Sequence, residues 1–266
     1  DLFGEALRLK PTLRQQMQLV SKCGIALPSG QRPEHSLKHY NTSAQHIRAS
    51  VEASLQALGT DRLDLLLIHR PDPLMDADEV AHCFEALQRE GKVLTFGVSN
   101  HTVQQFELLD SRTPLSTHQI ELSALHTDAL LNGTLDQAQR LRRRPMVWSP
   151  LAGGRLLSDT GAQATRTRVA LQAVAKAHGV SLATAAYAWV LRHPSRPHLI
   201  TGTGRREGLA EATGVLGGVL GALVYLVCFR FLPLDKPLAT LMSTVGMLLL
   251  LEEAIVHATA GMPQNY

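Results

Sequence analysis

Short apolar runs alternate along the chain with longer stretches in which apolar residues recur at three- and four-residue steps. The short runs are typical of buried parallel strands, and the longer stretches have the period of amphipathic helices. The predicted strands are Gln18–Ser21, Leu63–His69, Thr95–Ser99, His118–Leu122, Met146–Pro150 and His198–Thr201. The predicted helices are Ser43–Leu58, Asp76–Glu90, Thr102–Asp110, Asp128–Arg142, Arg166–Ala177, Leu182–Leu191 and Arg205–Ala212. This alternation predicts repeated β-α units around a parallel sheet.

The pattern changes after Ala212. Up to that residue charged and apolar positions are interleaved, whereas Thr213–Phe229 carries no charge and almost no polar group. A second apolar stretch runs from Pro237 to Leu251. The first run has about the minimum length for crossing a bilayer. We therefore predict one domain over residues 1–212 and a hydrophobic segment over 213–266, which we expect to form a transmembrane helical hairpin.

Composition and charge narrow the classes of partner. The formal net charge is +3. The only tight cluster of basic residues in the sequence, Arg142–Arg144, is interpreted as a solvated helix end. No nucleic-acid surface is therefore predicted. Three cysteines without ligand spacing indicate neither a disulfide framework nor a metal site, and they favour a reducing compartment. No secretory leader is visible at Asp1.

Polar residues follow each predicted strand, which is where β/α barrels carry their chemistry. The strand ends read Ser21-Lys22, His69-Arg70, Ser99-Asn100, Gln119 with Glu121, Trp148-Ser149 and Thr201–Thr203. Any one of these ends is weak support, because a polar turn follows most strands. Six in sequence predict a common site.

Six segments resemble the aldo-keto reductases, in their bacterial YdhF-like branch. These are VSKCGI, DLLLIHRPDPLMD, GKVLTFGVSN, HQIELS, MVWSPLAGGRL and LITGT, in family order over residues 1–212. The resemblance implies an NADP(H)-dependent oxidoreductase that reduces aldehydes and ketones. It also implies a TIM (β/α)8 barrel, of which about six of the eight strands are expected here and the first two are missing.

Two of the four catalytic residues of that family match positions of this chain. Lys22 matches the lysine that lowers the pKa of a catalytic tyrosine, and His69 matches the histidine that orients the substrate carbonyl. The alternatives without a function are that Lys22 only extends its ammonium group into solvent at a strand end, and that His69 is an ordinary histidine of the core. The family's Asp and Tyr lie in a DxADxYG-like segment, and this sequence contains none. We therefore expect the chain as printed to be a poor reductase.

The resemblance also implies a set of cofactor-binding residues. Ser99, Asn100 and Gln119 match those that bind the nicotinamide carboxamide, and Trp148 matches an aromatic that stacks on the ring, with ordinary core packing as its alternative. The pyrophosphate and adenosine contacts are expected from Ser149, Leu151, Gly153, Thr203, Arg205, Arg206 and Glu211. Gly208 departs from the arginine frequent in the family, which weakens the preference for NADPH over NADH.

The segment from Gly221 to Glu253 resembles part of a permease subunit of branched-chain amino-acid or urea ABC transporters. This likeness implies a membrane partner through residues 213–251 and an inner-membrane location, whereas the reductase part is expected in the cytoplasm. A hydrophobic helix pair packed on the barrel and a gene fusion are the alternatives. Two rival functions stay open: a permease fragment carrying a passenger barrel, and an NADPH-binding pseudoenzyme. The carbonyl substrate and the oligomeric state are not predicted.

Overall fold

The computed structural model describes residues 2–28, 30 and 36–202. Residues Asp1–Thr203 form one compact unit, to which the following description refers. The predicted helix Arg205–Ala212 and the whole segment 213–266 lie outside the described residues. Within the ranges that the structure describes, no helix is long and apolar enough to cross a bilayer. The expected membrane hairpin and its likeness to a permease fall beyond those ranges and stay predictions.

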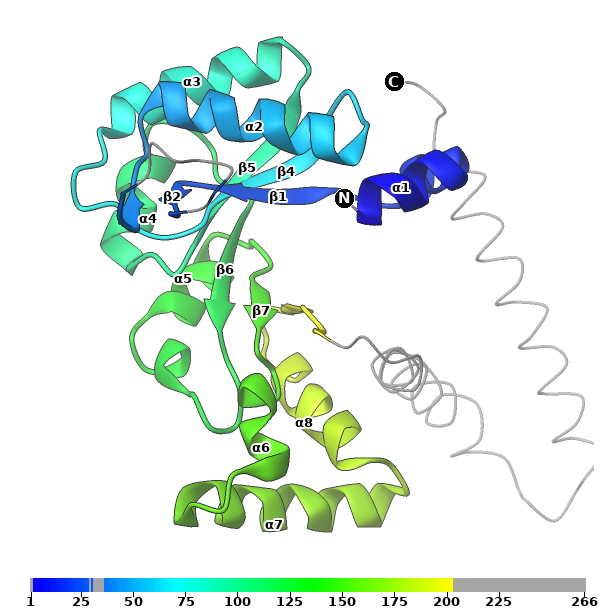
Figure 1. Ribbon diagram of the computed structural model, residues 1–266. Coiled ribbons are helices and arrows are strands. Elements are labelled where there is room, and N and C mark those ends of the chain that lie inside the picture. The colour runs from blue at the N-terminus through cyan, green and yellow to red at the C-terminus, as the bar shows by residue number, and fades with distance from the viewer. Residues whose placement is uncertain (1, 29, 31–35, 203–266) are drawn as a thin grey trace, which may run out of the picture. The chain divides into compact units, whose positions relative to one another are not determined.

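A parallel sheet of six strands is the centre of the unit, with the order β1-β4-β5-β6-β7-β8 (Figure 1). The strands are β1 (Val20–Cys23), β4 (Leu63–Ile68), β5 (Val93–Ser99), β6 (Thr117–Glu121), β7 (Met146–Trp148) and β8 (His198–Leu199). This confirms the six predicted strands, whose bounds shift by at most two residues. Among the described residues, β1 and β8 form the two edges of the sheet. A small antiparallel pair, β2 (Ile25–Ala26) and β3 (His39–Tyr40), follows β1.

Helices connect the strands. The α-helices are α1 (Leu2–Leu9), α2 (Ala44–Leu58), α3 (Ala77–Arg89), α4 (Val103–Asp110), α5 (Thr134–Arg140), α6 (Arg155–Ser158), α7 (Ala162–His178) and α8 (Leu182–Leu191). Short 3-10 turns are η1 (Pro11–Gln16), η2 (Asp128–Leu130) and η3 (Ala152–Gly154). Local chemistry sets the ends of α2: the Ser43 hydroxyl accepts from the His46 amide, and Gly59 ends the helix with a φ of 63°.

Register assigns the side chains to two faces of the sheet, because successive residues of a strand point to opposite sides. Lys22 pairs with Leu67, Leu67 with Gly97, and Gly97 with Thr117. These residues define the inner face. The opposite, outer face carries, among others, Ile68, Val98, Ile120 and Val147.

The largest apolar core lies between the outer face and the helices. Ile47 of α2 and Phe84 of α3 are fully buried there together with Ile68 and Val98. The Phe84 ring stacks on Phe96 of β5 with centroids 3.9 Å apart. Figure 1 shows α2 and α3 lying across β1, β4 and β5. This packing fixes the strands whose carboxyl ends carry the predicted site.

Two sequence predictions need correction. The helix expected over Asp128–Arg142 is broken into η2 and α5, because Gly133 adopts a φ of 83° and starts α5. The cluster Arg142–Arg144 is not simply a solvated helix end. Arg143 forms an ion pair with Asp110 of α4, and the Arg144 guanidinium donates to the carbonyl of Arg196 at 2.7 Å.

Candidate functional site

The carboxyl ends of the strands bring most of the predicted residues to one face. Ser99 of β5 pairs with Gln119 of β6, and Glu121 pairs with Trp148 of β7. By alternation these side chains share the inner face with Lys22 of β1. Ser99 and Gln119 are almost fully buried, at 1% and 3% exposure. The parallel sheet therefore brings the predicted lysine, serine, glutamine and tryptophan to the carboxyl-terminal part of its inner face.

A concentration of positive charge surrounds His69. This residue directly follows β4, and its amide donates to the carbonyl of Cys23 in β1 at 2.9 Å. Burial, together with the charges of Lys22, Arg70 and Lys38, lowers the pKa of His69 from 6.5 to about 4. His69 is therefore neutral at physiological pH, the form in which one ring nitrogen donates and the other accepts a hydrogen bond.

Lys22 is the second group of this cluster whose pKa is shifted. Burial and then the charge of Arg70 lower the pKa of Lys22. The positive charges of Lys22 and Arg70 disfavour a further positive charge nearby. They favour a negative charge that develops on the oxygen of a bound carbonyl group. A neutral imidazole beside an ammonium group is thus suited to bind and polarise a carbonyl.

Asn100 is the most constrained residue of the site. Its backbone φ is +59°, which is uncommon for a residue with a side chain. Its amide donates to the carbonyl of Gln119 at 2.9 Å, and its Nδ2 donates to the Ser99 hydroxyl at 2.7 Å. Its Oδ1 accepts from the Trp148 indole at 3.0 Å. Nδ2 carries a second proton besides the one donated to Ser99, and the Ser99 hydroxyl can itself donate.

Trp148 contacts residues that follow two different strands, Arg70 after β4 and Asn100 after β5. Its indole N–H is bonded to Asn100, while the Arg70 guanidinium lies 5.7 Å from its ring centroid, a cation–π distance. Both residues line an open groove of about 360 Å³. The other residues of this groove are Asn100, His101, Thr102, Ile120, Glu121, His126, Asp128, Ala129, Asn132 and Thr134.

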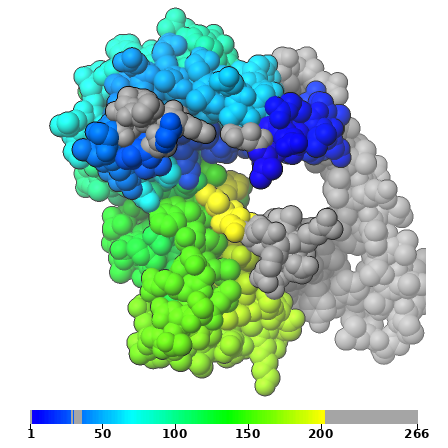
Figure 2. All heavy atoms as spheres, in the orientation of Figure 1, coloured from blue at the N-terminus to red at the C-terminus, as the bar shows by residue number. Residues whose placement is uncertain are grey.

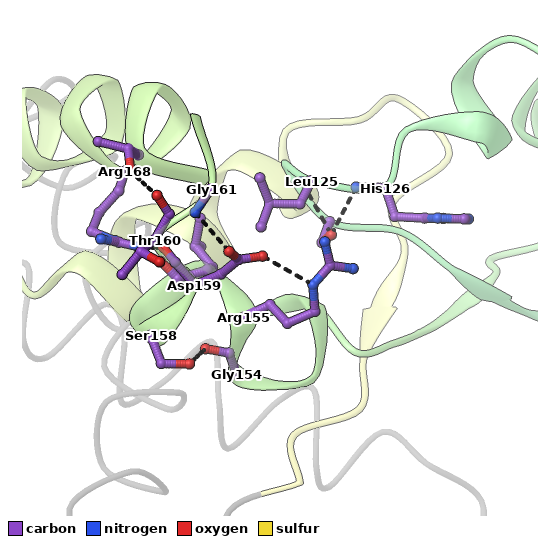
Figure 3. A network of polar contacts seen from close by, with 12 residues as sticks. Leu125, His126, Gly154, Arg155, Ser158, Asp159, Thr160, Gly161 and Arg168 are labelled. Carbon is purple, nitrogen blue, oxygen red and sulfur yellow. Dashed lines mark hydrogen bonds and ion pairs between the residues drawn. The ribbon is translucent and has the colours of Figure 1, made fainter. Parts of the chain in front are cut away.

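The turn after Trp148 has an unusual backbone. Ser149, Ala152, Gly153 and Gly154 all have positive φ angles. The segment that follows the turn carries a network of hydrogen bonds around Asp159 (Figure 3): the Gly161 amide donates to the Asp159 carboxylate at 2.8 Å, and the Arg155 guanidinium donates to it at 3.4 Å. Arg168 donates to the Leu156 carbonyl at 2.9 Å and also to the carbonyl of Asp159. Within the turn itself, the Ala152 amide donates to the carbonyl of Ser149 at 2.7 Å, and the Leu156 amide donates to that of Leu151 at 3.3 Å. The predicted pyrophosphate residues Ser149, Leu151 and Gly153 therefore lie on a hydrogen-bonded turn.

Some predicted positions are not located, and some residues of the site were not predicted. Thr203, Arg205, Arg206 and Glu211 lie outside the described residues. Arg70 and Glu121 were noted only as polar residues at the strand ends. That polarity was the only sign in the sequence that they belong to the site. His126 is the third such residue, with its Nε2 atom 4.0 Å from Glu121 and 3.8 Å from Asp128. It comes from a loop whose folding over the groove had no sequence signal.

The two tyrosines among the described residues lie outside the six-stranded sheet. Tyr40 lies in β3, partly exposed, and pairs with Ile25. Tyr187 is buried in α8. Within the described ranges no group of three or more His, Cys, Asp or Glu side chains is placed to hold a metal ion.

Comparison with known proteins agrees with this arrangement. The model of the aldo/keto reductase family matches residues 1–220. The chain belongs to the aldo/keto reductase family. It is 54% identical over 212 residues to the oxidoreductase YdhF of Escherichia coli, covering 79% of this chain and 70% of that protein. It is 46% identical over 217 residues to a 6-dehydroglucose reductase of Agrobacterium fabrum, covering 81% and 72%.

A solved aldo-keto reductase, the thermostable Tm1743 in complex with the inhibitor epalrestat, superposes with a TM-score of 0.68. It is 27% identical, and the match covers 81% of this chain and 71% of that structure. The predicted family and its barrel-like α/β fold with a parallel sheet are thus confirmed. The aldo/keto reductase match also passes the boundary predicted at residue 212, since it extends to residue 220.

Proposed function

We propose that this chain is an aldo-keto reductase unit that binds NADPH and holds a carbonyl substrate between the nicotinamide and His69. The observation that carries the proposal is the placement of Lys22, Ser99, Gln119 and Trp148 on one sheet face, beside His69. Several strand ends that converge on one point are the usual location of active sites in β/α barrels.

In this proposal Ser99, Asn100 and Gln119 bind the nicotinamide carboxamide, and Trp148 stacks on the ring. The bond from the Trp148 indole to Asn100 supports both roles, because it fixes the indole plane and the amide orientation together. When bound, NADPH would supply the hydride. Lys22 and His69 then stabilise the oxygen of the carbonyl as it gains negative charge.

We infer a polyhydroxylated, sugar-derived carbonyl compound as the substrate class. A relative at 46% identity is named as a 6-dehydroglucose reductase. The groove beside Trp148 carries groups that recognise hydroxyls: the carboxylates of Glu121 and Asp128, the amide of Asn132 and the guanidinium of Arg70. These polar side chains suit the hydroxyls of a sugar.

Tryptophan fluorescence tests the cofactor site with a matched pair of variants. The chain has two tryptophans, Trp148 in the site and Trp189 in α8 on the outer side. NADPH should quench the fluorescence of Trp189→Phe, which retains Trp148, in a saturable titration. Quenching of Trp148→Phe should be largely lost. Equal quenching in both variants, or none in the unmodified chain, would contradict the proposal, and an NADH titration measures the preference between cofactors.

Turnover is a separate question from binding. The printed sequence has no DxADxYG-like segment, and a general acid contributes about 10²–10⁴-fold to such a step. We therefore expect NADPH binding with little or no aldehyde reduction by this chain, followed as loss of absorbance of NADPH. Sustained turnover would contradict this expectation. Its loss in Lys22→Met would show that Lys22, or a group that depends on it, takes part in supplying the proton in place of the tyrosine.

A further inference from the structure

The turn that carries Asn100 and His101 is held by two consecutive residues of β6. The amide of Asn100 donates to the backbone carbonyl of Gln119, and the next amide, of His101, donates to Nε2 of His118 at 3.1 Å. His118 and Gln119 are consecutive residues of β6, so their side chains lie on opposite faces. Two successive amides of the turn are therefore satisfied by two successive residues of one strand.

We propose that His118 is a positioning residue of the nicotinamide site, which acts by accepting the His101 amide and thereby holding Ser99 and Asn100 in their ligand-binding conformation. The proposal rests on the proposed function for its ligand. His118 itself lies on the outer face, so it does not touch the cofactor. Its effect passes through one hydrogen bond to the backbone.

The turn needs such support. The φ of Asn100 is +59°, and a left-handed conformation costs an L-residue free energy that its surroundings must offset. The His101 ring adds a local contact, since its Nδ1 donates to the carbonyl of Ser99 at 3.0 Å. Without the acceptor on His118, a buried amide would lose its partner and the extended conformation of Asn100 would compete.

The surroundings of His118 keep its acceptor available. The ring is 6% exposed, and its centroid lies 5.5 Å from that of Phe106 and 6.5 Å from that of His101. Burial and the neighbouring His101 lower the pKa of His118 to about 3. The imidazole is neutral near pH 7, and its hydrogen bond with the amide requires the tautomer in which Nδ1 carries the proton.

Three variants of the full chain test the proposal by NADPH titration and thermal unfolding. His118→Leu removes the acceptor and should raise the NADPH dissociation constant by about tenfold. His118→Gln, whose side-chain oxygen reaches about as far as Nε2, should restore affinity to within about threefold. Val51→Ala in α2 is the control, because it lowers the melting temperature by enlarging a distant core and should leave NADPH affinity unchanged.

The outcomes are separable. Equal affinity of His118→Leu and the unmodified chain, or equally weak binding by the Leu and Gln variants, overturns the positioning role. Absence of NADPH binding by the unmodified chain overturns the proposed function alone, and hydrogen exchange at the Asn100 and His101 amides then decides: exchange should be faster in His118→Leu and protected in His118→Gln. If the Leu variant does not fold, nitrogen NMR of the unmodified chain decides, since a protonated Nε2 on His118 contradicts the proposal.

Discussion

Histidines are the residues through which this molecule responds to pH. His101 and His118 are buried, and burial is the main reason that their pKa values fall to about 4 and about 3. In the unfolded chain each would titrate near 6.5. Both are therefore neutral in the folded protein and take up a proton on unfolding at acid pH.

The unfolding free energy should consequently depend on pH in one direction. Because the folded pKa values are lowered, the contribution is fully present above about pH 6.5 and is lost as the pH falls toward 4. Each proton taken up contributes a slope of up to about 1.4 kcal/mol per pH unit. Urea unfolding at several pH values between 7 and 5 measures this slope.

The variant His118→Gln provides the control for that slope, because it removes one of the titrating histidines and retains a polar side chain. We expect a shallower dependence in this variant. An unchanged slope would mean that His118 does not titrate differently in the folded and unfolded chains.

At the scale of elements, the periodicity of the sequence predicted the strands and most helices, because buried parallel strands and amphipathic helices leave distinct patterns. The pair β2–β3, with two residues in each strand, and α6, with four residues, were not predicted. Elements this short have no measurable period. The break at Gly133 was missed for another reason: a glycine inside a helical pattern is often tolerated, and only the observed φ shows that it ends the run.

The candidate site was predictable to a similar degree. Residues at strand ends, such as Lys22 and Gln119, followed from the strand pattern and the family resemblance. His118 was placed on a strand, but its bond to the His101 amide depends on how the next loop folds back. Tertiary contacts of this kind have no counterpart in the spacing of residues.

Close strand packing gives the element scale its own prediction. A Cβ on Gly97 of β5 would lie 2.6 Å from the Thr117 carbonyl oxygen and 2.8 Å from Cδ2 of Leu67. Gly97→Ala should therefore destabilise the fold by about 1–3 kcal/mol, as overpacking does elsewhere. Gly202→Ala is the matched control, since nothing lies within 4 Å of its added Cβ. Chemical denaturation compares the two, and equal stability would contradict the close approach.

At the scale of the whole unit, the two edges of the sheet are the features from which we predict association between molecules. Among the described residues β1 has a neighbouring strand on one side only. Its Val20 is 39% exposed. On the other edge the yellow atoms of β8 are visible at the surface (Figure 2). Unpaired strand edges are sites of association with other chains.

We therefore expect the chain to self-associate as its concentration rises, and light scattering measures this. Val20→Lys should reduce association, because a charge on an edge strand opposes pairing. Val174→Lys, on an exposed position of α7, adds the same charge away from the edge and should have little effect. Equal behaviour of the two variants would locate the association elsewhere.

The alternation along β6 has a consequence for how this protein tolerates sequence change. Thr117, Gln119 and Glu121 point to the inner face, whereas His118 and Ile120 point to the helices. A substitution at Gln119 or Glu121 changes the inner face that carries the candidate site, whereas one at Ile120 changes the packing under the helices. Ligand preference and core packing can therefore be varied separately at alternate positions of this strand.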